Sequence, residues 1–280
     1  MIRGLYTGAA GMLSETIRMD VVANNLANAD KTAFKSDITV FKSFPQMLIR
    51  RLNDDGVRKF SLGSYDTMPI VGRLGTGVEV NEVYTNFEQG SLRETNNPFD
   101  FAIEGDGFFV VETERGLRYT RNGSFLLDKD NYIVTKDGYK VLGENGYIKV
   151  QSNNFVVNEK GEIIVNRDLY SRQIVSNVEN DWALSEIIDR FKIVTFREKR
   201  ELKKEGNSFY YETEFSGPAY TPEPENMPKI RQGFIEQSNV NIVKEMVYMI
   251  EVQRAYEANS KSVISHDNAL GRLFNTFSRV

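Results

Sequence analysis

Apolar residues recur at alternating spacings of three and four at both ends of the chain. Near the N-terminus the repeat runs through Ile2, Leu5, Ala9, Met12, Thr16, Met19, Ala23 and Leu26. Near the C-terminus it runs through Ile242, Met246, Met249, Gln253, Tyr256, Ser260, Val263, Asp267, Leu270, Phe274 and Phe277. Such spacing forms a stripe that lets one helix lie along another. It predicts axial helices over 1–36 and 239–280, which pair as a coiled coil with each other or with copies of themselves.

Between the two ends the pattern changes to a period of two. From about Gly77 onward, apolar residues alternate with others in pairs such as Phe125 and Leu127. Turn signals such as Asn122-Gly123 separate the pairs at short intervals. Short strands with frequent turns are typical of antiparallel sheets. The sequence therefore predicts a central, mostly antiparallel all-β domain over 77–220.

Two stretches with weaker patterns flank the predicted β domain. Residues 37–76 lack a clear period and are expected to form an irregular connector. Residues 221–238 contain three prolines, whose fixed φ predicts a stiff linker and return segment. Residues 180–189 fit a short helix between strands. The fold class is α+β, with discontinuous terminal helices and one β domain between them.

Composition and charge narrow the possible functions. The chain has 280 residues, of which 40% are hydrophobic and 26% charged, and these values are typical of a globular protein. The net charge of -4 argues against nucleic acid as a partner. No apolar run approaches the about 18 residues of a membrane span, so we expect no membrane insertion. Charged residues interrupt 1–20, which is unlike a cleaved signal peptide. The absence of cysteine excludes disulfides and thiolate ligands.

Residues with catalytic potential are sparse. The single histidine, His266, falls on the C-terminal helix beside a stripe position, which favours a surface or interface role. The glycines at 72, 75 and 77 have the wrong spacing for a phosphate loop, and a calcium-loop pattern that begins at Asp128 is not completed. Carboxylates are plentiful, so a glycosidase-like pair is the enzyme alternative, which turnover of a polysaccharide would reveal. We predict no enzyme, no cofactor and no metal site.

Several segments together resemble the bacterial flagellar axial proteins, those of rod and hook. The similar segments are 23–28 and 32–35 near the N-terminus, 105–110 and 119–125 in the middle, and 232–241 and 245–261 near the C-terminus. The first begins Ala23-Asn24-Asn25-Leu26, and the C-terminal pair opens with Gln232-Gly233-Phe234. Each fragment alone is a weak signal. Their order over nearly the whole chain makes the resemblance specific.

The resemblance implies a structural subunit of the flagellar basal-body rod, which assembles through its terminal helices into a helical tube that transmits torque from motor to hook. The implied partners are copies of itself, other flagellar rod proteins and the flagellar type III export apparatus. The implied location is the rod in the periplasmic space, reached without a cleaved signal peptide. The similarity of 1–37 favours the proximal, FlgF-like rod over the distal, FlgG-like rod, and a hook-type protein is less favoured. A coiled-coil dimeric β-domain binding module is the non-flagellar alternative, and it predicts a closed dimer.

The predicted assembly interface follows the two helical stripes and the N-terminal signature. It comprises Leu5, Met12, Met19, Asn24, Asn25, Leu26, Asn28, Phe34, Met246, Met249, Gln253, Tyr256, Asn259, Val263, Leu270 and Phe274. Its polar members would favour one register over slipped ones, because buried polar groups need partners across an interface.

Two further expectations concern local structure. The family signature normally carries glycine where this chain has Ala33, and alanine tolerates positive φ poorly, which argues against a left-handed turn there. In the β domain, Phe108, Phe109, Tyr119 and Phe125 are expected to pack in the core and not to contact a ligand.

Overall fold

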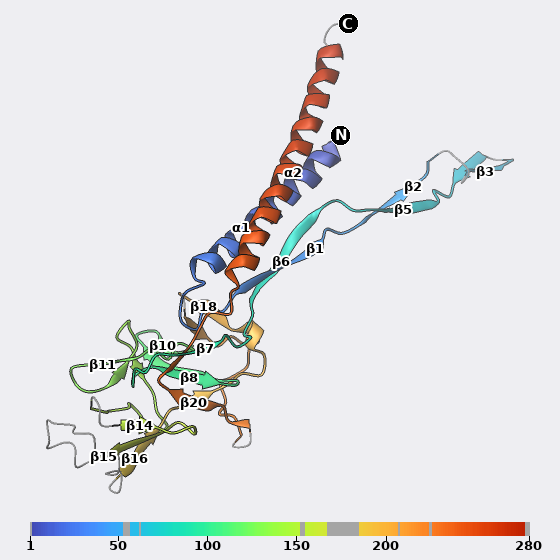
Figure 1. Ribbon diagram of the computed structural model, residues 1–280. Coiled ribbons are helices and arrows are strands. Elements are labelled where there is room, and N and C mark those ends of the chain that lie inside the picture. Colours follow the sequence, from blue (N-terminus) through green and yellow to red (C-terminus); the bar gives the residue numbers. More distant parts are fainter. Residues whose placement is uncertain are drawn as a thin grey trace. The chain divides into compact units, whose positions relative to one another are not determined.

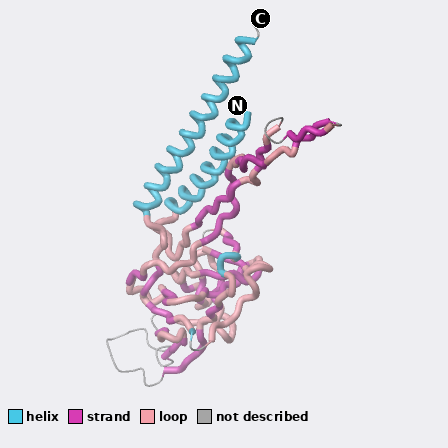
Figure 2. Tube along the Cα trace, turned by 90° about the vertical axis from the view of Figure 1, so that its right-hand side faces the viewer, coloured by secondary structure: helices cyan, strands magenta, loops and turns pink. Residues whose placement is uncertain are grey.

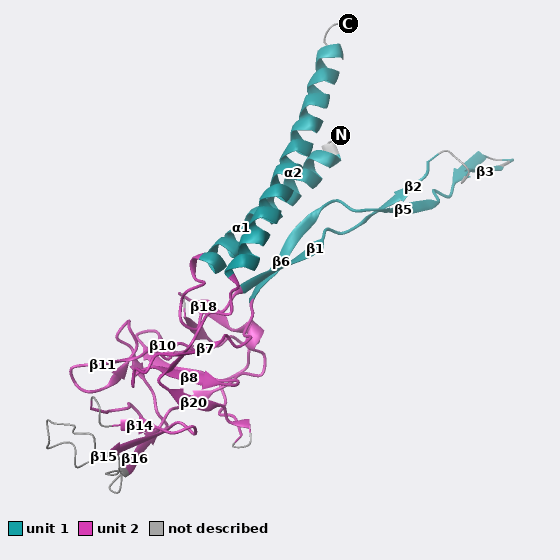
Figure 3. Cartoon of the chain, viewed as in Figure 1, with its two compact units in different colours: residues 1–26, 37–84, 242–280 teal, residues 27–36, 85–241 magenta. Residues whose placement is uncertain are grey.

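The chain divides into two compact units (Figure 3). The computed structural model describes residues 2–52, 57–61, 63–151, 155–166, 185–206, 208–223 and 226–277. The first unit comprises 1–26, 37–84 and 242–280, and the second comprises 27–36 and 85–241. The second unit therefore contains most of the predicted β domain. It also takes in the predicted linker and the end of the N-terminal segment. Among the described residues, no helix combines the length and the apolarity that crossing a bilayer requires.

The first unit contains two helices that lie side by side, α1 (Ile2–Ala27) and α2 (Ile242–Phe277) (Figure 2). Their contacts pair Gly4 with His266, Gly8 with Val263 and Gly11 with Asn259. Residue numbers rise along α1 as they fall along α2, so the helices are antiparallel. Glycine permits a close approach, because a Cβ added at Gly8 would lie only 2.8 Å from Val263 Cγ2. Both predicted terminal helices are thus present and in contact.

The face of α1 that is buried lies about one residue away from the predicted stripe. The buried residues of α1 are Gly8, Gly11, Ser14, Val22 and Asn25, which share one side of the helix. Ala9, Thr16 and Ala23 of the predicted stripe are exposed. The difference has a steric cause, because the glycines let the two backbones approach more closely than the larger stripe residues do. In α2, Val252 is buried and the predicted Gln253 is exposed.

The rest of the first unit is a two-stranded ribbon (Figure 1). Its paired strands are β1 (Asp37–Ser43) with β6 (Val78–Thr85), β2 (Met47–Arg50) with β5 (Ile70–Leu74), and β3 (Val57–Phe60) with β4 (Gly63–Asp66). The sequence predicted an irregular connector over 37–76, but the structure has these strands there instead. Leu48 and Ile49 are consecutive, so they point to opposite faces, and both are exposed. A ribbon without a single buried face gives no alternation for the sequence to show.

The second unit is a mostly antiparallel β body, as predicted. Its largest sheet has the order β11-β12-β13-β9-β10-β19-β18, with β17 also paired to β9. These strands are β9 (Phe108–Thr113), β10 (Gly116–Thr120), β11 (Leu126–Leu127), β12 (Ile133–Val134), β13 (Lys140–Val141), β17 (Ile193–Val194), β18 (Lys203–Glu205) and β19 (Phe209–Tyr211). A short 3₁₀ helix, η3 (Lys199–Glu201), precedes β18.

Smaller sheets complete the β body. They are β14 (Phe155–Val157) with β15 (Glu162–Asn166) and β16 (Ser185–Arg190), β8 (Phe101–Glu104) with β20 (Lys229–Gln232), and β7 (Leu92–Glu94) with β21 (Phe234–Glu236). The short helix expected within 180–189 is corrected over its described part, because 185–190 pairs with β15 as a strand. The remainder of that segment lies outside the described residues. The predicted linker 221–238 likewise contains β20 and β21, since backbone pairing to the body satisfies its hydrogen bonds.

The core lies on both faces of β9. Phe109 packs in one cluster of buried residues with Phe125, and Phe108 packs in a second cluster with Tyr119. All four aromatic residues that the sequence assigned to the core are buried. The prediction of core packing is therefore confirmed for each of them.

Truncating Phe109 to alanine is expected to lower the free energy of unfolding of the β body by about 3–5 kcal/mol, because the ring is fully buried and leaves a cavity. Chemical denaturation measures this change. Phe215→Ala is the matched control, since Phe215 is exposed and its loss should change stability by less than about 0.5 kcal/mol. Equal effects of the two substitutions would contradict the assignment.

Candidate functional site

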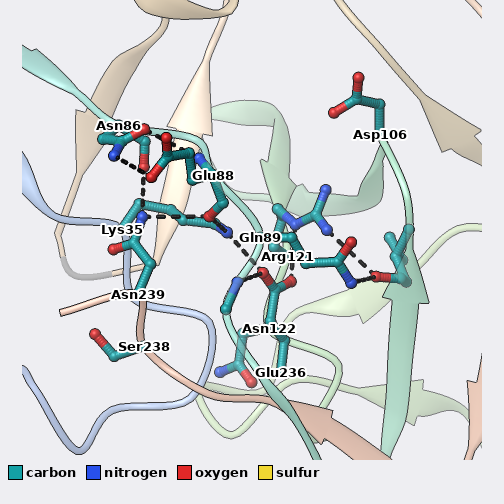
Figure 4. Close-up of polar contacts among 12 residues, drawn as sticks. Lys35, Asn86, Glu88, Gln89, Asp106, Arg121, Asn122, Glu236, Ser238 and Asn239 are labelled. Carbon is teal, nitrogen blue, oxygen red and sulfur yellow. Dashed lines mark hydrogen bonds and ion pairs between the residues drawn. The ribbon is translucent and has the colours of Figure 1, made fainter. Parts of the chain in front are cut away.

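Three charged side chains meet inside the β body (Figure 4). Lys35 Nζ lies 2.6 Å from Glu236 Oε1, and Arg121 Nε lies 2.8 Å from Glu236 Oε2. The side chains of Lys35 and Glu236 are 0% exposed, and that of Arg121 is 3% exposed. We call this group the clasp. It joins the N-terminal signature, the segment after β10 and strand β21, so it links three of the segments that carry the family resemblance.

The clasp also uses backbone groups. Gly90 N–H donates to Glu236 Oε1 at 3.0 Å, and Lys35 Nζ donates to the Glu88 carbonyl at 2.6 Å. The Arg121 guanidinium donates to the carbonyl oxygens of Ile103, Gly105 and Gly107. Buried charges are tolerated when pairing and hydrogen bonds replace their lost hydration. Each charge of the clasp therefore has the partners that its burial requires.

Burial affects the titration of the clasp lysine. Loss of hydration is the largest cause, and together with the nearby Arg121 charge it lowers the pKa of Lys35 to about 8, against the opposing effect of Glu236. The ammonium form still predominates at neutral pH. Lys35 therefore depends on the Glu236 carboxylate for its charge to remain buried.

The Asn239 side chain forms hydrogen bonds with two other segments of the β body, at Ser36 and Asn86. Its Oδ1 accepts from Ser36 N–H at 2.8 Å, and its Nδ2 donates to the Asn86 carbonyl at 2.8 Å. Asn86 N–H in turn donates to the Ser36 carbonyl at 2.8 Å. In sequence, the chain passes from one unit to the other within three residues of each of these residues. Since α2 begins only at Ile242, the Asn239 amide bonds to these connecting segments and not to the helix.

Ala33 adopts the left-handed conformation that its side chain argued against. Its φ is +55°, so that expectation is corrected. Ala33 N–H donates to the Glu236 carbonyl at 2.8 Å, and Lys204 Nζ donates to the Lys35 carbonyl at 2.9 Å. The Lys204 ammonium also lies 4.0 Å from the centre of the Phe34 ring. These contacts offset the conformational cost of positive φ, about 1–2 kcal/mol for an L-residue.

Replacing Ala33 with valine is expected to lower the free energy of unfolding by about 2 kcal/mol or more, because a β-branched residue is strained at positive φ and this site is buried. Ala33→Gly should change it by less than about 1 kcal/mol, since glycine relieves the strain but loosens the unfolded chain. Denaturant titration compares the two variants. A valine variant as stable as the glycine variant would refute the strained turn.

The predicted interface residues fall into three groups by exposure. Asn24, Met246, Gln253 and Phe274 are exposed. Leu5, Met12, Met19, Leu26, Met249, Tyr256, Asn259, Val263 and Leu270 are half-buried. Asn25, Asn28 and Phe34 are buried. Asn25 exchanges two hydrogen bonds of 2.9 Å with the backbone of Asp37, so its amide is engaged within the chain.

Further apolar residues are exposed that the sequence analysis did not assign to the interface. On the helices they are Tyr6, Leu13, Ile242, Val243, Val247, Ile250, Ile264 and Leu273. On the ribbon they are Ile38, Met47, Leu48, Ile49, Leu52, Tyr65, Met68, Ile70, Val71 and Val83. Tyr6 and Leu13 are seven residues apart, and 243, 247 and 250 are separated by four and three, so the helical set carried a periodic signal. This signal defines a second apolar stripe on each helix, beside the one that the sequence analysis used. A helix that is apolar on several sides packs against neighbours on several sides.

The paired terminal helices with uncovered apolar faces and a β body held together by a buried clasp define a structural subunit. Within the described residues, no group of acidic or histidine side chains is arranged to hold a metal ion. Models of three protein families match the chain. The matches are "Flagella basal body rod protein" over 5–35, "Flagellar hook protein FlgE/F/G D1 domain" over 102–165 and "Flagellar basal body rod FlgEFG protein C-terminal" over 231–276.

Curated relatives match over nearly their full length. The flagellar basal-body rod protein FlgG of Borreliella burgdorferi is 35% identical over 97% of both chains. The proteins of the same name from Buchnera aphidicola subsp. Acyrthosiphon pisum and from Bacillus subtilis are 33% and 30% identical, each over 98% of this chain and 99% of the relative. The chain belongs to the FlgF/FlgG family of flagellar basal-body rod proteins. It is a structural subunit of the rod and not an enzyme.

Proposed function

We propose that this rod subunit polymerises through its terminal helices into a helical tube that transmits torque from motor to hook. The observation that carries the proposal is the uncovered apolar surface of both helices. Met246 is 51% exposed and Phe274 is 73% exposed, although both lie on the predicted stripe. Removing apolar surface from water is favourable by about 25 cal/mol of free energy per Å². Helices of neighbouring subunits supply the missing cover.

The length of α2 supports contacts with other copies. His266 of α2 packs beside Gly4, close to the start of α1, and α2 continues for three further turns to Phe277. Those last turns, which include Phe274, have almost no α1 residue beside them. In the proposed tube they pair with helices of adjacent subunits in coiled-coil register. A contact that uses different faces on the two copies and does not close produces a filament.

The ribbon offers a second surface for a neighbouring copy. Among its described residues, the strands of the ribbon pair with each other, and apolar residues such as Leu48 and Ile49 are exposed on both faces. A two-stranded ribbon is marginally stable alone in water. We propose that the apolar faces of β2 and β5 are covered by another subunit of the same kind.

The FlgG-like position in the distal rod fits the relatives better than the FlgF-like position that the N-terminal similarity favoured. The three relatives described above share the FlgG name and align from end to end with this chain. We therefore propose a FlgG-type subunit, which contacts its own copies and other rod proteins in the periplasmic space. Export through the flagellar type III apparatus is the route implied by the axial family. Family membership leaves the closed-dimer alternative without support.

Electron cryotomography of cells that lack the protein tests the proposal. We expect an axial structure that stops within the rod and carries no hook, with full length restored by the wild-type gene. A rod that stops at its base would favour the proximal position. Complete rods with hooks in the deletion strain would contradict a structural role in the rod.

A further inference from the structure

The partners of the clasp are distributed unequally between the two chain ends. The Glu236 carboxylate is paired with Lys35, Arg121 and Gly90 N–H. Among the described residues, the carboxylate in direct contact with the Lys35 ammonium is that of Glu236, while Asp106 acts on it from a greater distance. If Lys35 departs, Glu236 keeps a cation and a backbone donor. If Glu236 departs, Lys35 keeps its charge in a dry site without a contacting anion.

The backbone contacts show the same inequality. The return segment, which we define as 229–241, pairs through β20 with β8 and through β21 with β7. Gln237 N–H adds a 2.9 Å bond to the Ser91 carbonyl. These contacts fix the return segment to the body without any help from the N-terminal side.

The N-terminal connector, residues 27–36, bonds to the rest of the β body through contacts such as Lys204 Nζ to the Lys35 carbonyl, and it also bonds to the return segment. Ala33 N–H donates to Glu236, and Asn239 N–H donates to the Phe34 carbonyl at 3.3 Å. Ser36 N–H donates to the Asn239 side chain. These three bonds, and the Lys35–Glu236 ion pair, are available to the connector only after the return segment has docked.

We propose that the two ends of the chain dock on the β body in a fixed order, the return segment first and the connector second. Lys35 enters its buried site only when Glu236 is already in place to receive its charge. Because the connector follows α1 directly in the chain, the segment after α1 is fixed on the β body only in a subunit whose return segment is already bound. The clasp thus makes docking of the connector conditional on docking of the return segment.

Amide hydrogen exchange of the full-length monomer, followed by mass spectrometry, tests the order. Lys35→Ala should raise exchange in 27–36 by about tenfold or more and leave 229–241 within about threefold of wild type. Equal acceleration of both segments by Lys35→Ala would overturn the proposal. Peptides covering 108–113 report global unfolding and serve as the internal control.

Two further variants separate charge compensation from general damage. Glu236→Gln should accelerate exchange in 27–36 by about tenfold or more, because Lys35 loses its contacting anion. Adding Lys35→Met to Glu236→Gln should restore most of the protection of 27–36, since the orphaned charge is gone. Unchanged protection of 27–36 in Glu236→Gln, or no recovery in the double variant, would overturn the role of charge. Should Glu236→Gln unfold the body, the Lys35→Ala result alone decides the order.

Discussion

Replacing Met246 with aspartate is expected to abolish polymerisation while the isolated subunit keeps its stability. Met246 is exposed within one chain, so a charge there should change the free energy of unfolding by less than about 0.5 kcal/mol. In the proposed tube the same position is covered by a neighbouring helix, and an unpaired charge in a dry interface costs several kcal/mol. Sedimentation and negative-stain microscopy measure assembly, and thermal unfolding measures the stability of the monomer.

Met246→Leu is the matched control for this experiment. Leucine keeps the apolar surface and a similar volume, so assembly should proceed as in the wild type. In cells, the aspartate variant should be non-motile and the leucine variant motile. Filaments of normal length from Met246→Asp would place this face of α2 outside the interface.

Glu236→Ala is expected to lower the free energy of unfolding of the β body by about 3–5 kcal/mol. The substitution leaves Lys35 and Arg121 buried without their carboxylate, and breaking a buried pair on one side is strongly destabilising. Chemical denaturation followed by far-ultraviolet circular dichroism, which reports on backbone structure, measures the change.

The control is an ion pair of the same length at the surface. Arg231 Nε lies 2.7 Å from Glu104 Oε2, but the two side chains are 48% and 42% exposed. Solvent screens such a pair, so Glu104→Ala should cost only about 0–1 kcal/mol. If Glu236→Ala lowers the free energy of unfolding by no more than Glu104→Ala does, burial adds nothing to the strength of the clasp.

The sequence predicted those elements whose burial leaves a periodic pattern. The terminal helices and the alternating strands of the β body are both of this kind, and Phe108 and Phe109 lie in the core as expected. The buried face of α1 lies about one residue away from the predicted stripe, because Gly8 and Gly11 control how closely the two helices approach. A pattern of apolar residues takes no account of glycine. Steric fit at the glycines, and not hydrophobicity alone, therefore determines which face of α1 contacts α2.

The ribbon and the clasp were beyond the reach of sequence patterns for different physical reasons. The ribbon has no single buried face, and its strands therefore show no clear alternation. The clasp depends on Lys35 and Glu236, which are 201 positions apart, and spacing along a chain does not place such residues together. The family resemblance had drawn attention to both segments, but it gave no contact between them. Ala33 shows the converse, since local propensity gave way to tertiary hydrogen bonds.

The most direct measurement is a high-resolution electron cryomicroscopy reconstruction of the assembled rod containing this subunit. We expect Val243, Met246 and Phe274 to be buried against helices of neighbouring subunits. We also expect the apolar faces of β2 and β5 to be covered by another copy. Terminal helices that contact only each other within one subunit, with these side chains still in water, would contradict assembly through the helices.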